Sequence, residues 1–160
     1  MNRTLFALLL TGLGCVAAGC AVQGTPFEKV SSPPGNAVIY VYRPYTWGSS
    51  ALRPEVSCGE ESARIGPGGY HAFIVPAGQK VVCIIQTEAG TDEVDLQTER
   101  RSYYIREELG WGALTSMPHL NPVDNDKAQS EIQQCKLETQ PPPEVQQSQQ
   151  PEPQTTGSAR

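Results

Sequence analysis

The fold is decided by the stretch GYHAFIVPAGQKVVCIIQ, residues 69–86. Two runs rich in β-branched and other apolar residues, 70–75 and 80–86, flank a turn-forming segment at 76–78. Such runs on either side of a turn predict two β-strands. Because the second run is apolar on both faces, we expect it to be a central strand covered on both sides.

The same pattern continues along the chain on both sides of this stretch. Short β-branched and aromatic runs alternate with segments rich in Gly, Pro and Ser, and an apparent hairpin turns at 59–61. Further strands are expected at 37–42, 55–58, 62–65, 93–97, 102–107 and 118–120. Many short strands at this spacing predict an all-β sandwich.

One short helix is expected after the last strand. Asp124 fits an N-cap, and Ala128, Ile132 and Cys135 follow at i, i+4 and i+7, which places them on one helix face. We expect this apolar stripe to lie on a sheet face. The residues that we expect it to cover are Val81, Cys83 and Ile85.

Composition divides the chain of 160 residues into four parts. We expect a signal peptide at 1–19, a tether that ends in SSPPG at 20–35, and the β-sandwich domain at 36–138; the tether is expected to be lipidated for the reason given in the next paragraph. Residues 139–160 are rich in Gln and Pro. A segment of this composition buries too little apolar area to offset its ordering entropy, so we expect a disordered tail.

The first twenty residues predict export. A short basic start with Arg3 precedes an apolar run at 5–13, and the small residues 17–19 stand directly before Cys20. The run is too short to span a bilayer comfortably. The segment resembles a bacterial lipoprotein signal ending in a lipobox, which implies lipidation of Cys20. Cys15 is a weaker candidate, and ordinary secretion or an uncleaved anchor is the alternative.

Four motifs resemble a family of bacterial lipoproteins that carry a domain of unknown function. They are YVYRP at 40–44, GGY at 68–70, PAG at 76–78 and SYYIR at 102–106. The resemblance implies an exported sandwich similar to immunoglobulin-like and transthyretin-like modules. It implies no activity and supplies no catalytic residues. By analogy with bacterial lipoproteins, the absence of Asp after Cys20 favours the outer membrane, and we expect the periplasmic side.

Three cysteines remain after processing. In an oxidising compartment two of them are expected to pair and one to stay free. We favour Cys58 with Cys83, as a staple between the two sheets. The alternative is Cys83 with Cys135, which would pin the helix to a sheet.

Catalytic and metal-binding templates are not recognisable in the sequence. His71 and His119, the only histidines, lack the spacing of a zinc site, and no Cys-x-x-Cys occurs. No nucleophile elbow, Ser-x-x-Lys or Walker motif occurs either. Glu107 and Glu108 are adjacent on a strand, so they point to opposite faces. We therefore expect neither an enzyme, nor a metal site, nor a cofactor.

One group of residues favours a binding surface. Arg43, Tyr45 and Trp47 follow the first strand, and Trp111 stands between two glycines; Tyr, Trp and Arg dominate binding hot spots. The alternative, which we favour, is that the aromatic residues complete the core and that Arg43 pairs with a carboxylate such as Glu107.

The expected function is that of a non-enzymatic, periplasm-facing interaction module. Its partners would be the membrane, through the lipid on Cys20, and an envelope protein or peptidoglycan. A net charge of −5 argues against nucleic acid and against a basic patch for lipid phosphates. The alternative is an envelope enzyme or enzyme inhibitor whose site is built from dispersed residues. A pocket holding His71 or His119 beside a carboxylate would favour the enzyme.

Overall fold

A computed structural model of the chain describes residues 24–46, 51–110 and 117–138. The expected signal peptide, Cys20 and the expected tail lie outside these residues. The described elements are β1 (Asn36–Arg43), β2 (Glu55–Cys58), β3 (Glu61–Arg64), β4 (Gly69–Pro76), β5 (Lys80–Thr87), β6 (Gly90–Gln97), β7 (Ser102–Leu109), β8 (Pro118–Pro122), α1 (Asn125–Ile132) and β9 (Lys136–Leu137).

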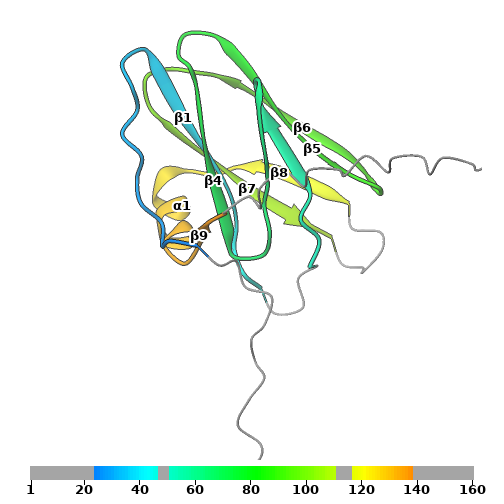
Figure 1. Ribbon diagram of the computed structural model, residues 1–160. Helices are drawn as coiled ribbons and strands as arrows, with labels where there is room; N and C mark the ends of the chain where they lie inside the picture. Colours follow the sequence, from blue (N-terminus) through cyan, green and yellow to red (C-terminus); the bar gives the residue numbers. More distant parts are fainter. Residues whose placement is uncertain (1–23, 47–50, 111–116, 139–160) are drawn as a thin grey trace, which may run out of the picture.

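The strands form two sheets, and the expected all-β sandwich is confirmed (Figure 1). One sheet has five strands in the order β8-β7-β1-β4-β9, and the other has four in the order β3-β2-β5-β6. β1 pairs with β4 antiparallel and with β7 parallel. The main core lies between the sheets, where alternate residues of β1, β4, β5 and β7 meet. β1 is thus the centre of the larger sheet.

β1, rather than β5, is the strand covered on both faces. Ala37, Ile39 and Val41 belong to the core between the sheets, whereas the intervening residues belong to a second cluster on the outer face of the same sheet. The strand expected at 80–86 does lie inside its sheet, between β2 and β6, but the expectation that both of its faces are covered was wrong. On β5, Ile84 is 36% exposed because no element covers the outer face of the four-stranded sheet in the described chain.

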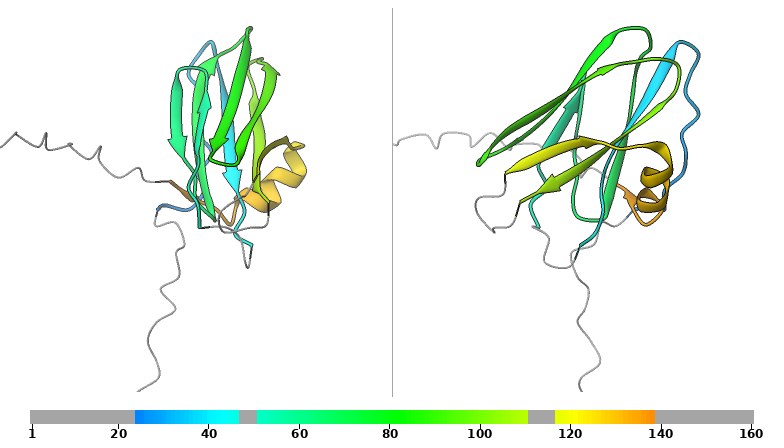
Figure 2. Two further views of the ribbon diagram at one scale, coloured as in Figure 1. Left: turned by 90° about the vertical axis from the view of Figure 1, so that its right-hand side faces the viewer. Right: turned by 180° about the vertical axis from the view of Figure 1, so that it is seen from behind.

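α1 packs against the outer face of the five-stranded sheet (Figure 2). The Tyr42 hydroxyl donates a hydrogen bond to Glu131 Oε2 at 2.7 Å, which joins helix and sheet. The buried cluster here consists of Val38, Tyr40, Tyr42, Tyr70, Tyr104, Ala128, Ile132 and Cys135. The helix and its apolar stripe are confirmed, but their expected position over Val81, Cys83 and Ile85 was wrong, because these side chains already face the other sheet.

Cys58 and Cys83 form the expected disulfide. They stand opposite each other on the neighbouring strands β2 and β5, so the bond lies within the four-stranded sheet and does not join the two sheets as expected. Cys135 is free and buried. Burial raises the pKa of its thiol to about 12, helped by the nearby Glu131 carboxylate, so the thiol stays protonated and unreactive in the native protein.

The segment before β1 lies along the domain. The Phe27 ring packs edge-on against Tyr40 and Tyr70, with centroids 5.4 and 5.1 Å away. The backbone N–H of Val30 donates to the Tyr40 hydroxyl at 2.7 Å. Residues 24–30, which we assigned to a tether, therefore help α1 to cover the outer face of the five-stranded sheet.

Candidate functional site

An Arg–Glu pair is buried where β1 and β7 end. Arg43 and Glu107 are 3% and 1% exposed, and Arg43 Nη1 lies 3.5 Å from Glu107 Oε1. The same Nη1 donates a hydrogen bond to the Leu52 carbonyl at 2.8 Å. The structure thus confirms the pairing of these two residues, and Arg43 does not belong to an exposed binding surface.

Glu107 is held in an unfavourable setting for a carboxylate. Neither carboxylate oxygen has a hydrogen-bond partner in the described part of the chain. Burial raises the pKa of Glu107 to about 8; the Arg43 guanidinium opposes this shift, and the Glu138 carboxylate adds to it. The group is therefore a source of pH-dependent stability.

We expect protein stability to fall as the pH rises toward 8. Between the ordinary Glu pKa of 4.5 and the native value of about 8, the native state keeps a proton that the unfolded chain has released. The free energy of unfolding should therefore drop by about 3–4 kcal/mol between about pH 5 and about pH 8. Glu107→Gln should remove most of this drop, as measured by urea unfolding at several pH values.

Glu108→Gln is the matched control for this measurement. Glu108 is the next residue on β7, points to the other face and is exposed, 3.3 Å from Arg106 Nε. Its replacement should leave the pH dependence unchanged. An equal effect of the two variants, or no fall in stability above pH 5, would contradict the protonated state of Glu107.

His119 lies beside this pair. It lines a hollow of about 340 Å³ together with Arg43, Glu107 and Glu108. Its Nδ1 is 3.9 Å from Asp92 Oδ2, and its side chain is 56% exposed. The hollow thus brings a histidine near carboxylates, although the carboxylate of Glu107 is fully enclosed and that of Glu108 faces Arg106.

His71 contacts a residue of the other sheet. It lies on β4, and its Nε2 is 2.8 Å from Glu61 Oε1 on β3. Its ring packs edge-on against Phe73. No group of three or more potential metal ligands gathers among residues 24–46, 51–110 and 117–138.

The expected aromatic surface is described only in part. Tyr45 is 63% exposed, next to the turn at Gly68. Trp47 and Trp111, the other two aromatic residues of that surface, lie outside the described residues. Within the described ranges, no helix is long and apolar enough to cross a membrane.

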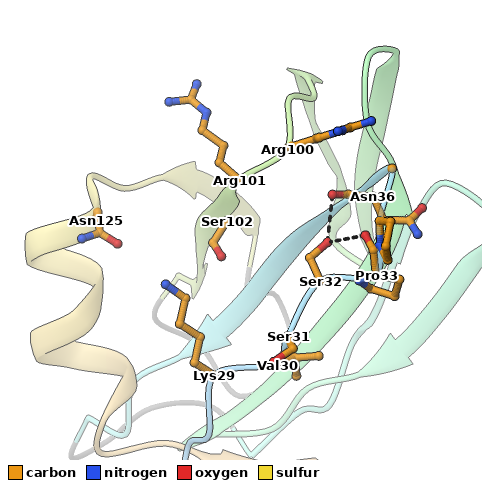
Figure 3. A pocket seen from close by; sticks show the side chains of 12 residues that line it. Lys29, Val30, Ser31, Ser32, Pro33, Asn36, Arg100, Arg101, Ser102 and Asn125 are labelled. Atoms are coloured by element: carbon orange, nitrogen blue, oxygen red, sulfur yellow. Dashed lines mark hydrogen bonds between the residues drawn. The ribbon is translucent and has the colours of Figure 1, made fainter.

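A basic hollow of about 770 Å³ lies near the start of β1 and β7 (Figure 3). Its cations are Lys29, Arg100 and Arg101, and Ser102 and Asn125 add polar groups. Figure 3 shows Lys29 reaching toward Ser102 and Asn125, while the two arginines project from the turn before β7. No carboxylate is among the described residues that line it.

The three cations of the basic hollow differ in their contacts. Arg101 stacks on the Tyr103 ring, with its guanidinium carbon 4.8 Å from the centroid, and lies 3.5 Å from Glu99. Lys29 and Arg100 form no ion pair with any residue that the structure describes. These two charges are available to a ligand, and the cluster favours an anionic group such as a carboxylate or phosphate.

Sequence reasoning missed the basic hollow. The net charge of −5 argued against a basic patch, yet the fold brings the 29–36 segment beside the turn at residues 100–101. Consecutive arginines at 100–101 were the available signal. Net charge describes the whole molecule, whereas a bound ligand interacts mainly with the charged side chains near its site.

The comparisons with known proteins give no family for this chain. It matches no protein-family model, and a search of curated proteins finds no match.

Proposed function

We propose that the chain is a non-enzymatic lipoprotein of the bacterial outer membrane that faces the periplasm and binds an anionic component of the envelope. The lipid on Cys20 is its membrane anchor, and the sandwich is its binding module. The basic hollow carries the proposal, because Lys29, Arg100 and Arg101 line one hollow in a protein of net negative charge.

Peptidoglycan is the partner that fits this hollow best. Its stem peptides carry carboxylates, which arginine and lysine bind through charge-assisted hydrogen bonds. Its sugars carry hydroxyl and amide groups that Ser32, Ser102 and Asn125 can meet around the same cavity. The hollow contains neither a histidine nor a cysteine among its described lining residues, which favours binding over acid–base or nucleophilic chemistry there.

The test is cosedimentation of the purified protein with isolated peptidoglycan sacculi. Lys29→Gln/Arg100→Gln should weaken binding at least about tenfold, because each lost charge-assisted hydrogen bond contributes roughly 1.5–3 kcal/mol. Added salt should weaken wild-type binding in the same way.

Arg64→Gln/Lys80→Gln is the matched control, since it removes the same charge from exposed sites in the four-stranded sheet. The control should bind as the wild type does. Equal binding by all three proteins would contradict the proposal, as would stronger binding to lipopolysaccharide than to sacculi.

A second candidate, an envelope enzyme, is supported by the hollow that places His119 near Glu107 and Glu108. The same sacculus experiment distinguishes it. Release of soluble peptidoglycan fragments by the wild type, and its loss in His119→Gln, would favour the enzyme. Binding without release would favour the binding module.

A further inference from the structure

The start of the described chain is fixed to one end of the sandwich. The backbone N–H of Leu137 donates to the Thr25 carbonyl at 2.8 Å, and Pro26 forms an antiparallel bridge with Lys136. Figure 1 shows this start beside β9. We call this end the loop end, and define it by residues 44–46, 51–54, 66–68 and 136–138. Gly24 is thus held at the loop end.

The distance from this point to the proposed anchor is short. Four residue steps separate Cys20 from Gly24. A chain spans at most about 3.6 Å per residue, so Gly24 lies within about 14 Å of a lipidated Cys20. A lipid anchor would therefore hold the loop end against the bilayer, with no long tether between them.

The loop end carries an exposed apolar patch, which consists of Tyr45, Leu52 and Leu137. These three residues are 63%, 41% and 37% exposed, in that order. Gly68 lies between the segments that carry Tyr45 and Leu137. An ideal Cβ at Gly68 would lie 3.5 Å from Tyr45 Cβ, and the Gly68 carbonyl accepts from the Lys136 N–H at 2.9 Å.

The Leu52 side of the patch is joined to β9 by an ion pair. Arg53 Nη1 lies 2.9 Å from Glu138 Oε1, and Glu138 Oε2 accepts a hydrogen bond from the Gly66 N–H at 3.2 Å. Arg53 and the exposed Lys136 are the sequence neighbours of Leu52 and Leu137. A tyrosine, two leucines and flanking cations suit the interface between lipid headgroups and acyl chains.

We infer that the loop end lies on the bilayer surface, with Tyr45, Leu52 and Leu137 in contact with lipid. The inference rests on the lipid anchor proposed above. The basic hollow then faces away from the membrane, because it lies near the opposite end of β1. Eight strand residues span about 25 Å, so the hollow is presented toward the cell wall.

Fluorescence quenching in vesicles tests this orientation. The lipidated protein is reconstituted with a Leu52→Cys substitution labelled with NBD, or with Ile84→Cys labelled in the same way. Ile84 is the matched control, since it is 36% exposed but lies on the outer face of the four-stranded sheet. Cys135 is buried, so labelling under native conditions selects the introduced thiol.

Lipids that carry a nitroxide near the headgroup should remove most of the fluorescence at position 52 and leave that at position 84 unchanged. Flotation of the vesicles reports the anchor separately. Protein that floats but shows equal quenching at both positions overturns the orientation and leaves the anchor in place. Protein that does not float overturns both.

Discussion

Cys20→Ser is expected to move the protein from the membrane fraction to the soluble periplasmic fraction. A lipoprotein cysteine carries several acyl chains, and each buried CH₂ contributes about 0.8 kcal/mol to membrane binding. Removal of the thiol removes every chain at once, so the expected effect is nearly complete. Cell fractionation and labelling with radioactive palmitate measure it.

Cys15→Ser is the control for this experiment, because Cys15 lies in the same expected signal peptide but would be removed with it. This variant should stay in the membrane and retain the label. A Cys20→Ser protein that remains labelled and bound to the membrane would contradict the anchor.

Loss of the Cys58–Cys83 disulfide is expected to destabilise the domain by about 3 kcal/mol, since a crosslink over 25 residues restricts the unfolded chain. Cys58→Ala/Cys83→Ala should therefore unfold at a clearly lower urea concentration than the oxidised wild type. A reductant should destabilise the wild type and leave the double variant unchanged. Equal stability of the two proteins under oxidising conditions would contradict this contribution.

A count of free thiols tests the same disulfide independently. The denatured, unreduced domain should show one free thiol, that of Cys135. The native domain should show none within the time of the assay, because Cys135 is buried. Three free thiols in the denatured domain would show that the disulfide does not form.

Local pattern was sufficient to predict the strands, because β-branched runs and the turns between them are features of neighbouring residues. Asp124 at the N-cap of α1 and the buried stripe of Ala128 and Ile132 follow from helix periodicity in the same way. The contact between Arg43 and Glu107 was predictable because a buried guanidinium at the end of an apolar strand needs a polar partner.

The errors concern which surfaces meet. Several inward faces were equally apolar, so the sequence did not show that α1 would cover Tyr40 and Tyr42. Cys58 and Cys83 lie in one sheet because β2 pairs with β5. This pairing depends on the order of the strands, which the residues around each cysteine do not show. For the same reason Lys29 and Arg100, far apart in sequence, could not be assigned to one hollow.

We propose above that this sandwich is a lipid-anchored module of the envelope. Intact mass spectrometry of the protein extracted from bacterial membranes tests it most directly. We predict a chain that begins at Cys20 and carries a thioether-linked diacylglyceryl group and an acylated amino terminus. A mature chain whose Cys20 is unmodified, or one that retains residues 1–19, would contradict the lipid anchor.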